Sequence, residues 1–406
     1  MNSSRLLLHP LLAICASGTL LGGCVSGGAS PDDTPKAAVP EDRYTPLVAE
    51  VTTPSVQIVQ GTDGKLHAVY EIRFANTRPV AATLQRVAVV DDNGQRSHAS
   101  FEGSELRQRL RSLSGRPAEP AIALDNVRQL LVDLRFDDLA DIPATLRHRI
   151  DLLAASTNVT SPRPAQQRYD LAPLVLDTSA PLVIGPPLRG TGWVAYNGCC
   201  DAGGAHRGAG LPVNGAVHFA QRFAIDWIRM NAQGRTVDGD DTDVHNYTAY
   251  AAEVIAVADG TVVDVVDDLD DQTPPKLPDP ATITLQNVDG NHVTLDLGQG
   301  RYAFYAHLKK NSVAVRVGDR VTRGQVLGEV GNTGNTSAPH LHFHVMDSPS
   351  VLGSSGLPYV IDRFGHAGQV PPALAVQFDR SWSSALFAEP ARREKQFPLD
   401  LSVIDF

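Results

Sequence analysis

The sequence predicts a mainly β protein with two folded domains. Its 406 residues exceed the about 100–200 residues of one ordinary domain. It contains 34 Gly and 28 Pro but only 6% aromatic residues, a balance that favours short strands and turns over long helices. Short β-branched or alternating runs such as SVQIVQ and HAVYEIRFAN are separated by turn signals at Asp63-Gly64 and Asn93-Gly94. We therefore expect a β-sandwich-like domain over residues 45–182 and a second β-rich domain over residues 183–406.

The composition excludes several functional classes. A hydrophobic fraction of 42% and a charged fraction of 20% are those of a soluble globular chain. The net charge of −10 disfavours attraction to nucleic acid, so we expect no nucleic-acid partner. Residues 45–182 contain no cluster of His, Cys and carboxylates with ligand spacing, which predicts a non-catalytic positioning or binding domain.

The N-terminus carries the pattern of a secretory signal. Arg5 precedes an apolar stretch over residues 6–21. Leu21-Gly22-Gly23-Cys24 resembles a bacterial lipobox, which implies that the Cys24 thiol receives a lipid after cleavage. An uncleaved anchor is the alternative, but His9-Pro10 interrupts a stretch that is already short for the about 20 apolar residues that a membrane span needs.

This address predicts where the protein works. We expect a signal peptide over residues 1–23 and a flexible tether over residues 24–44, which is rich in Ser, Gly, Pro and Ala. The mature protein is then exported and held on a bacterial membrane by its lipid, facing the periplasm or the cell wall.

The cysteines left after processing are adjacent in the sequence. Cys15 leaves with the signal peptide and Cys24 carries the lipid, so Cys199 and Cys200 remain. In an oxidising compartment they either form a vicinal disulfide or pack as small apolar side chains. His206 lies near them in sequence, so a cysteine peptidase is an alternative to metal chemistry.

Three alternate histidines in the segment NTSAPHLHFHV form the clearest chemical signal. On a strand, side chains two residues apart point to the same face, so His340, His342 and His344 can face one site. Leu341 and Phe343 then face the core. Neutral imidazole is the commonest zinc ligand, and a catalytic zinc usually takes three protein ligands.

The best candidate for an acidic ligand is Asp226 in QRFAIDWIRM. It lies between Ile225 and Trp227, where an unpaired buried carboxylate would be costly. A metal ion bound by Asp226 and two histidines would explain this placement. The alternatives are a carboxylate satisfied by an arginine or backbone amides, and histidines that form a structural network.

Taken in order, the segments RFAIDW, VIAVADGTVVDV, FYAHL and VRVGDRVTRGQVLGEVGNTGNTSAPHLHFHV resemble the lysostaphin/LytM-type zinc endopeptidases of bacterial cell walls. The resemblance covers about residues 185–350. It implies a β-sheet peptidase domain with a duplicated hybrid motif. It also implies that Asp226 and His342 bind zinc, and that His340 and His307 flank the attacking water and the substrate carbonyl.

The third zinc ligand departs from the pattern of the family. The family usually has a histidine a few residues before the aspartate, where this chain has Arg222. His218 would lie about 26 Å from Asp226 along an extended strand. A two-residue hairpin turn at Asn214-Gly215 would instead pair residue 206 with residue 223. We therefore expect His206 to be the third ligand, with His218 as the alternative.

The resemblance implies a zinc-dependent endopeptidase that hydrolyses amide bonds in the peptide stems or cross-bridges of peptidoglycan. In this interpretation His340 orients or deprotonates the water, while His307 stabilises the oxyanion or passes a proton to the leaving amine. One alternative is a non-catalytic LytM-like regulator or scaffold that binds the wall. Another is a latent enzyme in which the N-terminal domain or a loop such as DGDDTDVHNYTAY covers the cleft, with a protein activator as a further candidate partner.

Overall fold

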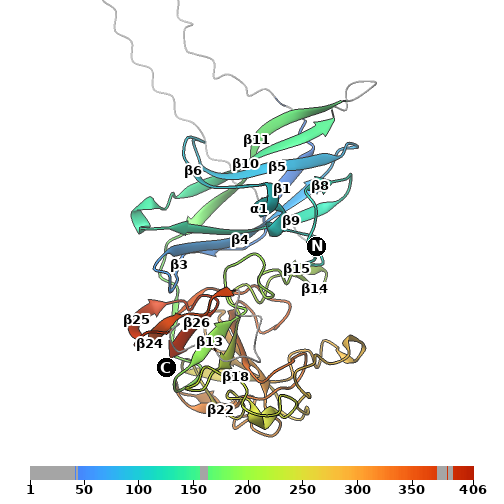
Figure 1. Cartoon of the computed structure of the whole chain (residues 1–406). Coiled ribbons are helices and arrows are strands. Elements are labelled where there is room, and N and C mark those ends of the chain that lie inside the picture. Colours follow the sequence, from blue (N-terminus) through green and yellow to red (C-terminus); the bar gives the residue numbers. More distant parts are fainter. Residues whose placement is uncertain (1–41, 43, 156–162, 373–381, 383–386) are drawn as a thin grey trace, which may run out of the picture. The chain divides into compact units, whose positions relative to one another are not determined.

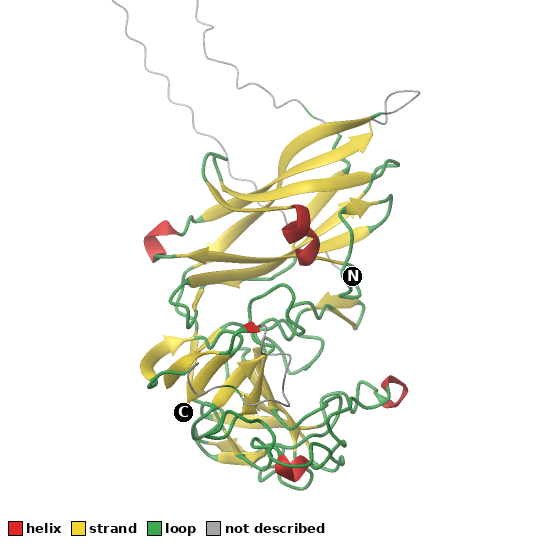
Figure 2. Cartoon of the chain, viewed as in Figure 1, coloured by secondary structure: helices red, strands yellow, loops and turns green. Residues whose placement is uncertain are grey.

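Strands make up most of the regular structure, and helices are confined to short segments (Figure 2). The computed structural model describes residues 42, 44–155, 163–372, 382 and 387–406. The expected mainly β fold is thus confirmed. The expected signal peptide (residues 1–23), the lipidated Cys24 and nearly all of the tether lie outside the described residues.

The first half of the described chain forms two packed sheets (Figure 1). One sheet contains β1 (Leu47–Val51), β3 (Val59–Gln60), β4 (Leu66–Asn76), β7 (Leu110–Arg111) and β9 (Val127–Phe136). The other contains β2 (Val56–Gln57), β5 (Ala82–Asp91), β6 (Ser97–Glu102), β8 (Ala121–Ile122), β10 (Thr145–Ala155) and β11 (Pro164–Asp177). The helix α1 (Gly103–Arg109) and the 3-10 turn η1 (Leu139–Asp141) join strands of this region.

A shared core makes these two sheets a β-sandwich. Ile72 and Leu130 of the first sheet pack in one apolar cluster with Val87 and Ile150 of the second. Asp63-Gly64 and Asn93-Gly94 form turns between strands, as the sequence predicts, with each glycine at positive φ. The two sheets form a sandwich because residues two apart on a strand, such as Ile72 and Phe74 of β4, point into this shared core.

The second half of the described chain is organised around an eleven-stranded sheet. It contains β12 (Leu182–Ile184), β13 (Trp193–Tyr196), β16 (Ile225–Arg229), β18 (Gly260–Val266), β19 (Asn291–Asp296), β20 (Tyr302–Leu308), β21 (Arg320–Val321), β23 (Leu341–Met346), β24 (Tyr359–Gln369), β25 (Ala391–Gln396) and β26 (Ser402–Asp405). Two small two-stranded sheets accompany it. One is the hairpin of β14 (Leu211–Val213) and β15 (Ala216–His218), and the other pairs β17 (Glu253–Ile255) with β22 (Val326–Glu329). Two further 3-10 turns are η2 (Val244–Asn246) and η3 (Pro280–Thr282).

One face of the large sheet forms the main apolar core of this half. Ile225 and Trp227 of β16 and Leu341 and Phe343 of β23 are fully buried in it. The residues between them, Asp226 and His342 among them, therefore face the opposite side. One face of the sheet is therefore packed in the apolar core, while the other carries the polar side chains of Asp226 and His342.

Residues 45–406 form one unit, and residues 1–44 form another whose described residues are Asp42 and Tyr44. The predicted division between domains at residues 182 and 183 stays a prediction. Among the described residues, no helix has the length and apolar character to cross a membrane.

A buried histidine of the sandwich gives its stability a pH dependence. His67 Nδ1 lies 2.9 Å from Asp133 Oδ1, and Nε2 lies 3.2 Å from Asp63 Oδ1. Burial lowers the pKa of His67, but the two carboxylates outweigh it and raise this pKa to about 9. The folded protein therefore keeps a proton that the unfolded chain releases near pH 6.5.

We predict that this contribution is fully present below pH 6.5 and is lost as the pH rises through about 9. His67→Gln should therefore lower the thermal unfolding midpoint more at pH 6 than at pH 10. Unfolding curves of both proteins at pH 6, 8 and 10 measure the difference. A difference that is constant across this range would contradict the assignment.

Candidate metal centre

Four neighbouring strands place one residue each in a row across the sheet, and three of these residues are polar. In the antiparallel register, Tyr196 of β13 lies opposite Asp226 of β16, Asp226 lies opposite His342 of β23, and His342 lies opposite Ala306 of β20. Residues directly opposite on neighbouring strands have Cβ atoms about 4.5–5.5 Å apart. Strand register alone therefore brings the carboxylate of Asp226 against the imidazole of His342.

His206 joins this pair to complete a buried group of three. The candidate ligand atoms of His206, Asp226 and His342 all lie within 4.8 Å of one another. His342 Nδ1 lies 2.9 Å from Asp226 Oδ1, and His206 Nε2 lies 3.4 Å from Asp226 Oδ2. Two imidazoles and one carboxylate form a donor set that suits a catalytic zinc.

His206 reaches this position by a route that differs from the expected one. The turn at Asn214-Gly215 forms as predicted, but the ladder that it closes is only three residues long on each strand and ends at the pair Leu211 and His218. The extension that would pair residues 206 and 223 is absent from these strands, so that part of the prediction is wrong. A series of turns carries His206 instead, and its Nδ1 lies 3.3 Å from the Ala224 carbonyl oxygen. His218, the alternative ligand, lies outside the group of three.

A β-bulge directs His307 into the same site. Regular alternation would send its side chain to the core, because Ala306 pairs with His342 on the opposite face. The register between β19 and β20 shifts at this point, and His307 has a φ of 61°. A left-handed backbone is uncommon for a residue other than glycine, and such residues concentrate at functional sites. The bulge thus turns the ring of His307 toward His340, with ring centroids 4.7 Å apart.

Backbone carbonyl groups fix the orientation of three of these rings. The Nδ1 atoms of His206, His307 and His340 lie 3.3, 2.7 and 2.8 Å from the carbonyl oxygens of Ala224, Thr333 and Ala338. A carbonyl oxygen can only accept, so each Nδ1–H donates. Every one of these rings therefore presents its Nε2 atom to the site.

Two further residues contact the site: His344, which the alternation placed on this face without a role, and Asn197, which the sequence did not indicate. Asn197 Nδ2 donates to Asp226 Oδ2 at 2.8 Å, and His344 Nδ1 lies 3.0 Å from His342 Nε2. The alternation of the histidines pointed to His344, which is fully buried behind His342. No local pattern in the sequence marks Asn197, because its contact with Asp226 spans 29 residues.

Burial and charge perturb every ionisable group of the site. Burial raises the pKa of Asp226, but the charges and hydrogen bonds of His206 and His340 outweigh this effect and hold the pKa well below its usual range. Burial, together with the neighbouring imidazoles, holds the pKa of His307 well below its ordinary value. Such strong, opposed perturbations in one cleft are typical of functional sites.

The group lies at the base of a cleft of about 390 Å³. Its lining combines the polar residues of the site with apolar and aromatic ones; they include Tyr196, Asn197, His206, Asp226, Ile228, Tyr247, Leu277, Asp289, His307, Asn335, His340 and His342. The cleft is therefore open to a substrate while the candidate ligands stay buried.

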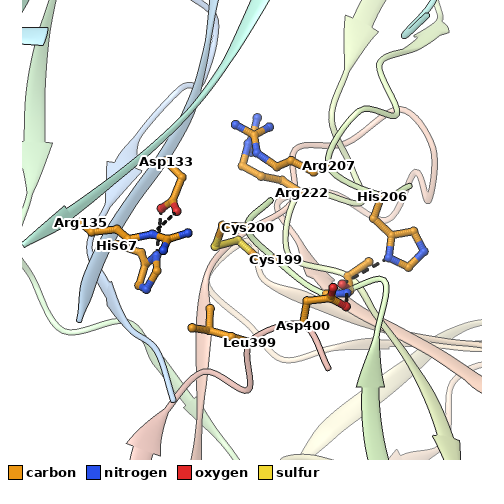
Figure 3. The surroundings of a disulfide bond; sticks show 12 residues. His67, Asp133, Arg135, Cys199, Cys200, His206, Arg207, Arg222, Leu399 and Asp400 are labelled. Carbon is orange, nitrogen blue, oxygen red and sulfur yellow. Dashed lines mark hydrogen bonds and ion pairs between the residues drawn. A yellow bond between two sulfur atoms is a disulfide. The ribbon is translucent and has the colours of Figure 1, made fainter. Parts of the chain in front are cut away.

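Cys199 and Cys200 form a vicinal disulfide on the segment between Asn197 and His206 (Figure 3). Of the two states that the sequence allowed, the structure thus contains the bridged one. Both residues are buried, and a disulfide offers no thiolate nucleophile. The cysteine-peptidase alternative therefore has no support in this structure.

Comparisons with known proteins agree with the chemistry of this face. Residues 241–352 match the family model described as Peptidase family M23. The chain contains a peptidase M23 domain. The match includes His307, His340 and His342, whereas His206 and Asp226 precede the matched residues.

Two curated relatives match a short part of this chain. Peptidoglycan DD-endopeptidase ShyA of Vibrio cholerae is 40% identical over 57 residues, which are 14% of this chain and 13% of the relative. Glycyl-glycine endopeptidase ALE-1 of Staphylococcus capitis is 47% identical over 58 residues, which are 14% of this chain and 16% of the relative. The chain thus matches less than a fifth of the length of either relative.

Among solved structures, the catalytic domain of lysostaphin from Staphylococcus simulans is 24% identical, with a TM-score of 0.22. The match covers 41% of this chain and 84% of that one.

We predict that the group of three binds one zinc ion. His206→Ala, Asp226→Asn and His342→Ala should each weaken zinc binding by more than about 100-fold, because loss of a direct ligand exceeds the 10–100-fold cost of losing an outer contact. Calorimetric titration of metal-stripped protein measures the affinity. His218→Ala is the matched control and should bind like the wild type; loss of binding in this variant and not in His206→Ala would reverse the choice of ligand.

Proposed function

We propose that this protein is a zinc-dependent endopeptidase that hydrolyses amide bonds in the peptide part of bacterial peptidoglycan. The observation that carries the proposal is the convergence of five side chains in one cleft. His206, Asp226 and His342 form the candidate metal group, and His307 and His340 lie beside it. The peptidase M23 domain and the names of the two relatives support the same class of reaction.

The donor chemistry of the site fits zinc. Asp226 is buried and its pKa is held well below the usual range, so its carboxylate is ionised beside the imidazoles of His206 and His342. Buried charges in proteins are paired or coordinate metals. When bound there, zinc supplies a Lewis acid toward the scissile carbonyl and makes water more acidic. His344 and Asn197 hold the ring of His342 and the carboxylate of Asp226 from outside the group.

The other two histidines are placed to move protons. His340 and His307 both expose Nε2 to the cleft, because their Nδ1–H groups donate to carbonyls. His340 Nε2 accepts a proton from the attacking water. The Nε2 of His307 lies beside His340, so it can receive the proton that His340 takes from the water and pass it to the leaving amine. Their rings are close enough for both to contact one scissile amide.

The proposed substrate and location complement each other. The N-terminal sequence predicts export and a lipid on Cys24, which would hold the protein on a bacterial membrane, facing the periplasm or the cell wall. The assay below tests whether the protein cuts an amide bond in the peptide stems or cross-bridges. A wall-binding regulator without activity is the competing outcome of that assay.

We predict that the full chain, in detergent and loaded with zinc, releases new amino groups from intact peptidoglycan sacculi. His340→Ala and His307→Ala should each slow this release by about 10²–10⁴-fold, which is the usual contribution of a positioned acid or base. Release of amines over time, with and without a metal chelator, measures the activity.

His245→Ala is the control for the loss of a histidine, because His245 is exposed and lies outside the cleft lining. It should act like the wild type. A wild type that binds zinc and releases no amines would contradict the proposed activity and favour the regulator.

A further inference from the structure

The segment that carries His206 has little regular structure of its own. Between β13 and β14 it folds as successive turns, with Gly204 N donating to Asp201 O at 3.0 Å and Gly208 N to Gly204 O at 3.2 Å. Such turns leave a side chain free to shift by more than a metal ligand tolerates. Contacts from elsewhere in the chain must therefore define where His206 lies.

One such contact comes from the β-sandwich through Arg207, the neighbour of His206. The guanidinium of Arg207 forms an ion pair with Glu71 of β4. It also donates to the carbonyl oxygens of Tyr70 at 2.7 Å and Val132 at 3.2 Å. Arg207 is 1% exposed and Glu71 is fully buried, so water does not compete for these bonds.

The same carboxylate holds a second segment of the metal centre. Arg222 lies shortly before Asp226 in the sequence. It donates from Nε and Nη2 to the two oxygens of Glu71 at 3.0 and 2.8 Å. Its Nη1 donates to Ser355 Oγ and to the carbonyl oxygen of Gly356, both at 2.8 Å. Figure 3 shows the two arginine side chains reaching toward each other. Glu71 thus ties together the chain segments that deliver His206 and Asp226.

Further contacts of the sandwich reinforce this anchor. Arg111 of β7 donates to the carbonyl oxygen of Ala202. Leu131 of β9 packs with Ala202 and Phe219 in a small buried cluster. The turn segment therefore contacts the sandwich at Ala202 as well as at Arg207.

The energetics of this cluster favour a positioning role over a stabilising one. Burial raises the pKa of Glu71, but Arg222 and Arg207 lower it to about 2, so the cluster holds one negative and two positive charges at neutral pH. A buried ion cluster is weak evidence for stability, because well-packed apolar residues often serve as well or better. What ionic bonds do provide is directed geometry.

We propose that the N-terminal β-sandwich is a structural part of the metal centre, and that Glu71 and Arg207 are positioning residues for the ligand His206. This inference rests on the proposed function for the identity of the metal. It gives the sandwich a structural role in the metal centre, although the sandwich supplies none of the three candidate ligands.

The test compares Arg207→Met with the wild type in the full chain. Methionine preserves much of the apolar stem of Arg207 and leaves Glu71 and Arg222 as a balanced pair, so the cluster loses its excess positive charge. We expect the variant to fold, to bind zinc about 10-fold more weakly or worse, and to give an altered visible spectrum when loaded with cobalt. Competition with a chromogenic chelator measures the zinc affinity, and the cobalt spectrum reports the ligand geometry.

Two other variants make the comparison specific. Arg73→Met removes a half-exposed arginine on the same strand as Glu71 and should match the wild type in both readouts. Arg207→Lys keeps the buried charge but cannot reach all three acceptors, so it should fall between the wild type and Arg207→Met. It also replaces Arg207→Met if that variant does not fold.

The outcomes separate this inference from the proposed function. A folded Arg207 variant with wild-type zinc affinity and cobalt spectrum overturns the positioning role, whatever the activity of the wild type. A wild type that binds zinc but releases no amines overturns the peptidase, while a weakened Arg207 variant still supports the positioning role. A wild type that binds no zinc overturns both.

Discussion

The antiparallel pairing of β16 with β23 is the constraint on which the site depends. It sets Asp226 opposite His342 while Ile225, Trp227, Leu341 and Phe343 fill the core behind them. A slip of one residue would reverse every side chain of a strand, so the buried apolar residues hold the polar ones in register. The precision of the candidate metal group is thus a consequence of core packing.

The second constraint is the charge of Asp226. Its buried carboxylate accepts a hydrogen bond from Asn197 and lies within 3.4 Å of nitrogen atoms from three imidazoles. Carbonyl groups orient the rings of His206 and His340, and His344 contacts the ring of His342. A preorganised ring of this kind loses little entropy when it binds a cation, which suits a site whose ligands must keep a fixed geometry.

The sequence could predict the parts of the site that lie on regular strands. Alternation correctly placed Leu341 and Phe343 in the core, and with them the side of the sheet that His342 faces. The route of His206 could not be predicted, because turns replace the ladder beyond Leu211 and His218. The contacts of Glu71 with Arg207 and Arg222 span more than 130 residues, so no local pattern records them. Arg222 is not part of the candidate metal group, and its side chain contacts Glu71 of the sandwich instead.

The bulge at His307 makes this strand unusually sensitive to length. Ala306 and His307 together lie opposite one residue of β19, so β20 carries one residue more than its partner needs. Deletion of His307 would remove one proton-transfer group from the cleft, together with the backbone hydrogen bonds that His307 makes with Asp289 and Gly331. We therefore expect insertions and deletions in β20 to be rare among related chains that keep the function.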